Sequence, residues 1–283
     1  MNKQILILVI CGVLLAVGLY VFGRTKSSPS AMAMPLGAMT GGHVMPGNTS
    51  TADFGAVLKI AHNDLPATKL DSLKLLDDQL KAAPNNQAVL KLLVKFWAFN
   101  GNPAVAGKYL SDIAQNSGSA KDWSNAGDAF NITFQQTNDS IIRIFAVQQA
   151  IVCYKNAVDK DSTNLNNQVK LAQCYVDGSG DVMNGVLILK GLEQKEPDNV
   201  DVNLLLGRLD IESGQLDKAL PRLEKLVKRH PTVAEAYFYL GMAYKASGKT
   251  DKALQTFEEC RKMITDPNGQ KQIDNIIQQL KNS

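Results

Sequence analysis

Three stretches of the chain differ in how apolar and polar residues follow one another. Residues 5–22 read ILILVICGVLLAVGLYVF and carry no charge. Residues 27–52 contain no Lys, Arg, Asp or Glu and show no regular apolar spacing. From Asp53 onward, apolar residues recur three and four positions apart, the spacing of one face of an α-helix. The pattern predicts an all-α protein with an apolar N-terminal segment, a tether and a helical body.

The apolar segment has the length of a membrane span. At about 1.5 Å per residue, a helix over residues 5–22 measures about 27 Å, close to the hydrocarbon thickness of a bilayer. The run ends at Gly23, Arg24 and Lys26 and lacks the small-residue cleavage site of a secreted protein. We interpret residues 1–26 as an uncleaved transmembrane signal anchor that contacts the membrane through residues 5–22.

The orientation of this anchor is less clearly encoded. Lys3 and the amino terminus on one side are balanced by Arg24 and Lys26 on the other. A short polar lead before an apolar run favours a cytoplasmic N-terminus. We therefore expect a single-pass protein of the bacterial inner membrane with a periplasmic body, and a body facing the cytoplasm is the alternative.

The second stretch, residues 27–52, is rich in Pro, Gly and Met, which predicts a flexible tether with a reach of about 30 Å. Its Met residues together with His43 could bind copper(I), because thioether sulfur suits that ion. Their irregular spacing favours a plain linker instead, and no metal is predicted. The Met residues concerned are Met32, Met34, Met39 and Met45.

The third stretch repeats itself with a period of 34 residues. Gly207 maps onto Gly241, and two further sets of positions keep the same spacing. The first set is Gly185, Leu189, Leu192 and Pro197, followed 34 residues later by Ala219, Leu223, Leu226 and Pro231. Another step of 34 from the first three of these gives Ala253, Phe257 and Cys260.

The unit that begins at Ala234 resembles the tetratricopeptide repeat. Its signature positions hold Tyr237, Leu240, Gly241, Tyr244, Gly248, Ala253 and Phe257. The preceding unit, 200–233, matches through Leu206, Gly207, Gly214, Ala219, Leu223 and Pro231, but Asp210 replaces the usual aromatic residue. Small residues at Gly241 and Ala253 allow the two helices of a hairpin to approach closely.

Earlier units diverge but keep the phase of the repeat. Leu171, Ala172 and Tyr175 open one unit, Trp123, Ala126, Gly127 and Phe130 open another, and Leu90, Leu93 and Trp97 open a third. The middle one of these is about eleven residues too long, which predicts an exposed loop around residues 135–140. Residues 53–86 look like a degenerate first hairpin that ends at Pro84.

The resemblance implies a right-handed α–α superhelix over residues 53–268, built as one solenoid of about five to six repeats. Residues 269–283 are expected to form a C-terminal capping helix. An apolar stripe of Ile273, Ile276, Ile277 and Leu280 would face the last repeat. A coiled-coil seam is the alternative, but the stripe is about one heptad long.

Composition adds little about function. The net charge of +3 favours no nucleic-acid partner, and an aromatic content of 6% suits packing of helix on helix. The four Cys include no CxxC pair, so neither a zinc site nor a disulfide framework is predicted. Cys153, Cys174 and Cys260 fit a core role, and a link between Cys153 and Cys174 is conceivable without support.

Catalytic patterns are missing from the sequence. His43, His62 and His230 are scattered, and there is no phosphate-binding glycine loop or nucleophile elbow. The acidic pairs Asp77–Asp78 and Glu258–Glu259 suit solvated helix faces. The sequence therefore predicts no catalytic residue, no cofactor and no enzyme activity.

The resemblance implies a concave groove lined by the first helix of each hairpin, where protein or peptide partners bind. Its ammonium and amide groups suit a carboxylate, and its apolar residues form a patch. The groove positions are Lys91, Lys95, Phe99, Asn125, Asp128, Val169, Lys170, Gln173, Leu204, Leu205, Arg208, Phe238, Tyr239 and Met242. Phe238 or Tyr239 could instead pack beneath a neighbouring unit.

Part of this groove resembles the clamp with which some tetratricopeptide domains hold acidic C-terminal tails. Lys91, Asn125 and Lys170 fall near clamp positions, but Lys95 stands where that clamp has Asn, and Asn166 where it has Lys. Ordinary solvated lysines on a helix face are the favoured interpretation.

Together, these features predict a membrane-tethered scaffold or adaptor of the bacterial cell envelope. One alternative is an assembly factor similar to the anchored repeat subunits of cytochrome c maturation. Another is a periplasmic chaperone-like protein that binds many clients, and a third is self-association with a structural role. The oligomeric state is not predicted.

Overall fold

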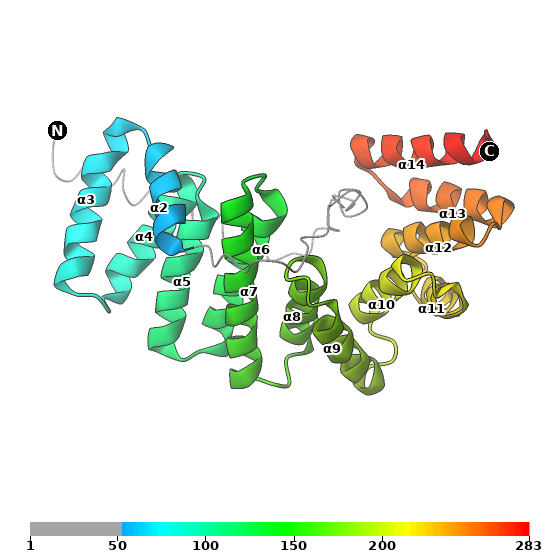
Figure 1. Ribbon diagram of the computed structural model, residues 1–283, viewed down its shortest axis with the longest axis horizontal. Helices are drawn as coiled ribbons and strands as arrows, with labels where there is room; N and C mark the ends of the chain where they lie inside the picture. The colour runs from blue at the N-terminus through cyan, green and yellow to red at the C-terminus, as the bar shows by residue number, and fades with distance from the viewer. Residues whose placement is uncertain (1–52, 283) are drawn as a thin grey trace. The chain divides into compact units, whose positions relative to one another are not determined.

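A computed structural model describes residues 53–282, and this part of the chain contains thirteen α-helices and no strand (Figure 1). The expected membrane segment 5–22 and tether 27–52 lie outside the described residues. Within residues 53–282, none of the helices combines the length and the apolar composition that crossing a membrane requires. The all-α fold class is confirmed for this part of the chain.

The described residues form two compact units that meet in sequence between His230 and Pro231. This division falls inside the range that we expected to form one solenoid. The N-terminal unit contains α2 (Phe54–Asn63), α3 (Ala67–Ala82), α4 (Gln87–Phe99), α5 (Pro103–Ser117), α6 (Ala120–Gln136), α7 (Ser140–Lys160), α8 (Leu165–Asp177), α9 (Val182–Lys195), α10 (Val200–Glu212) and α11 (Leu216–Arg229). The C-terminal unit contains α12 (Ala234–Ala246), α13 (Thr250–Met263) and α14 (Pro267–Lys281).

Consecutive helices pair as hairpins in the register that the repeat predicts. The pairs are α4–α5, α6–α7, α8–α9 and α10–α11 in one unit and α12–α13 in the other. A Cβ atom on Gly207 would lie 2.7 Å from Leu223, and one on Gly241 would lie 2.8 Å from Phe257. These positions admit glycine because any larger residue would separate the two helices of the hairpin.

The turns inside the hairpins repeat as well. Gly180, Gly214 and Gly248 lie 34 residues apart and have φ angles of 73°, 73° and 72°. This left-handed conformation costs a glycine little and other residues more. The period seen in the sequence is therefore a period of backbone geometry.

The extra length of the middle unit does not form the loop expected around residues 135–140. It lengthens both helices of the hairpin, so that α6 has 17 residues and α7 has 21, whereas α8 has 13 and α9 has 14. Three residues, 137–139, connect α6 to α7, and the Asp139 side chain caps α7. A short capped turn satisfies the helix ends within the chain, which a long loop does not.

The first hairpin expected over residues 53–86 is also different. α2 packs against α5 and α7, and α3 packs against α4. Val57 and Ala61 of α2 are buried, and the ring centroids of Phe54 and Phe145 lie 6.0 Å apart. α2 is thus an amphipathic helix docked on the second helices of two hairpins.

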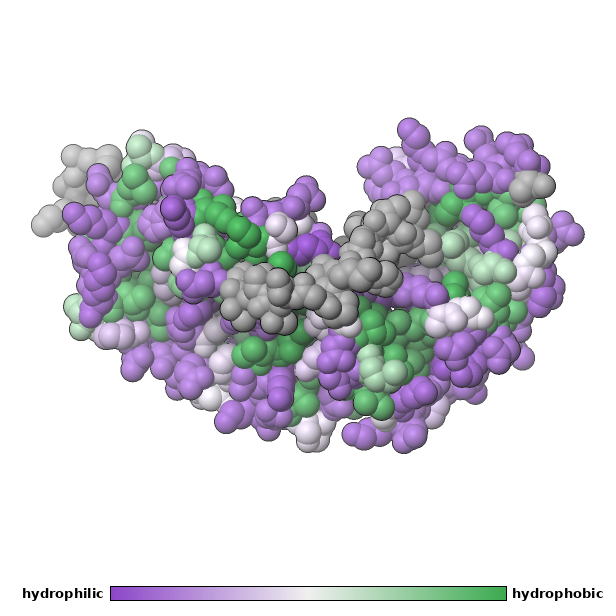
Figure 2. Space-filling model, viewed as in Figure 1, coloured by the Kyte–Doolittle hydropathy of each residue, from purple (hydrophilic) through white to green (hydrophobic). Residues whose placement is uncertain are grey.

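The C-terminal helix begins at Pro267, where Asp266 caps it through the Gly269 amide at 2.7 Å. Ile273, Ile277 and Leu280 are buried, and α14 packs against α13. Figure 2 shows hydrophilic side chains over α14. The helix therefore covers the apolar face of the last hairpin and presents a polar surface.

Candidate functional site

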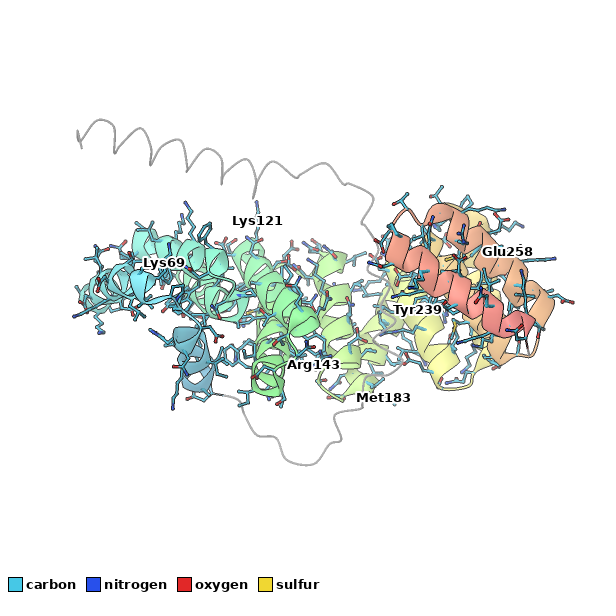
Figure 3. All side chains as sticks on the ribbon, turned by 90° about the horizontal axis from the view of Figure 1, so that it is seen from above. Lys69, Lys121, Arg143, Met183, Tyr239 and Glu258 are labelled. Carbon is cyan, nitrogen blue, oxygen red and sulfur yellow. The ribbon has the colours of Figure 1, made fainter. Side chains whose placement is uncertain are left out.

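The first helix of the first complete hairpin, α4, exposes two cations beside an aromatic ring. Lys91 and Lys95 are exposed, and Phe99, one turn further along, is 79% exposed. The Lys69 ammonium of α3 lies 6.0 Å from the centre of the Phe99 ring (Figure 3). Within residues 53–282, no carboxylate lies within 4.0 Å of Lys91 or Lys95. This end of the N-terminal unit offers positive charge together with an apolar contact.

The next first helices, α6 and α8, are joined by polar contacts. Lys170 donates to Asp128 at 2.6 Å, and the Tyr154 hydroxyl donates to the same carboxylate oxygen at 2.7 Å. Burial raises the pKa of Tyr154, and the Asp128 charge raises it further. Lys170 is therefore neutralised by a neighbouring helix, whereas Asn125, also on α6, is exposed.

A similar pairing links α8 to α10. Arg208 is buried and forms an ion pair with Asp177, and a second carboxylate, that of Glu212, lies 3.8 Å away. Leu204 is buried and the half-buried Leu205 packs against the apolar core. These three positions were expected to line an exposed groove, but in this structure they hold helices together because inter-helix contacts already occupy their side chains.

The remaining three expected groove residues lie on α12, in the C-terminal unit. Phe238 and Tyr239 are each 4% exposed, and Met242 is half-buried. The Phe238 ring contacts Tyr239 and Phe257, with centroid distances of 5.4 and 6.1 Å. Phe238 thus packs against the second helix of its own hairpin and differs from the exposed patch that we expected.

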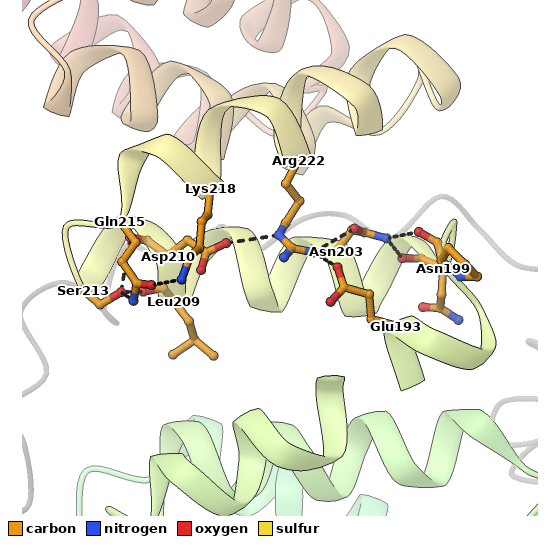
Figure 4. A network of polar contacts seen from close by, with 10 residues as sticks. Glu193, Asn199, Asn203, Leu209, Asp210, Ser213, Gln215, Lys218 and Arg222 are labelled. Carbon is orange, nitrogen blue, oxygen red and sulfur yellow. Dashed lines mark hydrogen bonds and ion pairs between the residues drawn. The ribbon is translucent and has the colours of Figure 1, made fainter. Parts of the chain in front are cut away.

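Asp210, the residue that departs from the repeat signature, has a structural role that the sequence did not reveal. It accepts a hydrogen bond from Arg222 at 3.1 Å, and Arg222 also contacts Glu193 and Asn203 (Figure 4). Asn203 in turn donates to the backbone oxygens of Pro197 and Asn199. An ion-pair network therefore joins α9, α10 and α11 where the signature has an aromatic residue.

Groups with reactive chemistry are engaged in structure. Cys153, Cys174 and Cys260 are free thiols and are buried, and burial raises their pKa values to about 11, 12 and 12. Cys153 contacts Ser111 at 3.4 Å, and no disulfide joins it to Cys174. A search of residues 53–282 finds no group of three metal-ligating side chains. The possible copper ligands of the tether lie outside the described residues.

Solved structures similar to this chain include YrrB, described as a TPR protein with an unusual peptide-binding site. It is 13% identical with a TM-score of 0.45, and the match covers 68% of this chain and 93% of YrrB. A MamA D159K mutant is 22% identical with a TM-score of 0.42, and the match covers 56% of this chain and 83% of MamA.

A sequence comparison identifies the family. Residues 204–263, which run from α10 into α13, match the family profile described as Tetratricopeptide repeat. Proteins built from such stacked repeats use their extended surfaces to contact other proteins. The resemblance inferred from the 34-residue period is confirmed over these residues, which belong to the tetratricopeptide repeat family.

Proposed function

We propose that this protein is a membrane-tethered adaptor that captures an acidic peptide segment of a partner protein on α4. The observation that carries the proposal is the exposed set of Lys91, Lys95 and Phe99. A carboxylate of the partner would bind the two ammonium groups, and an adjacent apolar side chain would cover the Phe99 ring. Further along the unit, Lys170 and Arg208 already have carboxylate partners, so they contribute little charge to a ligand.

The tether and anchor complete the proposal. An uncharged apolar run at residues 5–22 followed by an uncharged linker would hold the body close to a membrane, and we place that body in the periplasm. Such a protein recruits partners and catalyses no reaction. A cytochrome c maturation factor and a general chaperone would use the same surface, for one client class or for many.

Photocrosslinking from a reactive amino acid at position 99, in native membranes, tests this function. One dominant adduct is expected, and Lys91→Glu combined with Lys95→Glu should reduce its yield at least tenfold because both charges are reversed. Lys271→Glu, on the exposed side of α14, is the matched control and should leave the yield unchanged. Equal yields in all three proteins would refute the α4 site, and many faint adducts would indicate a chaperone.

A further inference from the structure

The outer side of α9 carries an apolar stripe. Met183 is 67% exposed and Leu187, one turn later, is 60% exposed. Gly191 follows one turn further and is also exposed, with no atom within 4 Å of the position that a Cβ would occupy. Figure 2 shows hydrophobic surface in the region of α9, and Met183 is labelled in Figure 3. The stripe runs along more than two helical turns and contains no charge.

The repeat does not require apolar residues at these two positions. The side of α9 that faces the core holds Gly185, Leu189 and Leu192, all of them buried. The residues equivalent to Met183 and Leu187 are Asp217 and Pro221 on α11 and Asp251 and Gln255 on α13. Large exposed apolar side chains that the fold does not need mark a surface that contacts another protein.

The stripe is complementary to itself. When two copies of α9 lie antiparallel and cross at Leu187, Met183 of each copy faces Gly191 of the other, so that a long side chain fits over a position without one. Lys190 then faces Asn184, and Asp181 at the start of one helix approaches Lys195 at the end of the other, which pairs opposite charges. We propose that α9 is a homodimer interface with a twofold axis at Leu187, so that the protein binds a second copy of itself through a surface distinct from the α4 site.

The strength of this association follows from its size. A single pair of helices buries less area than the roughly 1,000 Å² typical of stable complexes. The dimer is therefore weak and depends on concentration, and closed twofold pairing stops it at two copies.

Cysteine crosslinking of the full chain in detergent tests the axis. In a Cys11→Ser background, Leu187→Cys places one thiol from each copy at the axis, while Cys153, Cys174 and Cys260 are buried. Mild oxidation should give a disulfide-linked dimer at least tenfold faster than for Pro221→Cys, the equivalent position on α11. Equal rates for the two variants would mean random collision and would overturn the proposal, as would an adduct of Leu187→Cys with a different protein in native membranes.

A size exchange tests the packing independently. Gly191→Met should weaken the dimer at least tenfold in sedimentation velocity because two Met side chains would collide. Adding Met183→Gly should restore it, since the long and the absent side chain then change places. Both positions are exposed, so circular dichroism should remain that of the wild type. A chain that stays monomeric at every concentration, or a dimer that ignores both substitutions, would contradict the proposal.

Discussion

Asp128 separates the structure from the clamp that the sequence resembles. Its carboxylate accepts one hydrogen bond from Lys170 at 2.6 Å and another from Tyr154 at 2.7 Å. Lys170 was expected to bind the carboxylate of a ligand, but it already binds one within its own chain. The sequence places Asp128 and Lys170 on first helices, yet the pairing joins residues 42 positions apart, which only the packing of α6 against α8 determines.

We predict that Asp128→Asn destabilises the N-terminal unit by about 1–2 kcal/mol. An amide keeps part of the hydrogen bonding but loses the charge, and partial exposure of both side chains limits the loss. Urea denaturation followed by circular dichroism measures the change. Asp78→Asn removes an exposed pair with Lys81 and should cost almost nothing, so equal losses for the two variants would contradict the assignment.

Two glycines in helix interiors should respond to alanine with opposite signs. A Cβ on Gly127 would lie 2.6 Å from the Tyr154 ring, whereas one on Gly191 meets nothing within 4 Å. Gly127→Ala should therefore destabilise the fold by about 1–3 kcal/mol, and Gly191→Ala should stabilise it by about 0.5–1 kcal/mol. Thermal unfolding at low protein concentration compares them, and a shift of the same sign in both would be unexpected.

At the scale of helices, periodicity predicted the hairpins but not their lengths or all of their partners. The 34-residue spacing fixed the phase of α8 to α13 because each interior position selects residue type. It was silent on the extra turns of α6 and α7, since more helix of the same amphipathic kind leaves the phase intact. α2 was misassigned because its apolar face suits any apolar surface, and the residues of α5 and α7 that receive it are distant in sequence.

Undocking α2 should loosen the helices that it covers. Val57 is 1% exposed, so Val57→Asp would bury a charge and should release α2 from α5 and α7. Hydrogen exchange should rise in α2 and in the first halves of α5 and α7 while α10 and α11 keep their protection. Lys59→Asp, on the exposed side of α2, is the matched control. Faster exchange throughout the unit would mean that α2 is part of a single cooperative core instead.

The candidate site was predictable to the extent that it depends on surface position. Lys91, Lys95 and Phe99 are exposed as expected of one helix face. Phe238, Tyr239, Leu204 and Arg208 are buried, and repeat position alone does not reveal burial because it depends on the neighbouring helix. The apolar side of α9 was missed since interior positions, not outer ones, define the repeat.

At the scale of the whole molecule, buried thiols make stability depend on alkaline pH. The folded pKa values of Cys153 and Cys174 are raised from 9.0 to about 11 and 12. Above pH 9 the unfolded chain loses these protons and the folded chain keeps them, so unfolding becomes more favourable as pH rises toward 11 to 12. Below pH 9 both states hold the protons and the effect vanishes.

We therefore expect the free energy of unfolding of the N-terminal unit to fall between pH 8 and pH 10 by about 1 kcal/mol for each thiol. Urea titrations at the two pH values measure the difference. The variant with Cys153→Ala and Cys174→Ala should be less stable at pH 8 but should lose less on going to pH 10. An unchanged slope in that variant would assign the effect to other groups, such as Tyr109, whose pKa burial raises to about 12.

The position of α2 also decides where mechanical tension would act. The chain enters the described structure at Asp53, directly before this helix, and α2 is held on α5 and α7 by Phe54, Val57 and Ala61. If the N-terminus is fixed and the body is pulled away, the load reaches these contacts before any hairpin. Force applied at one end of a short helix peels its contacts apart one after another. Stretching the 10 residues of α2 would add about 35 Å of extension, so this helix would lengthen the leash while every repeat stayed folded.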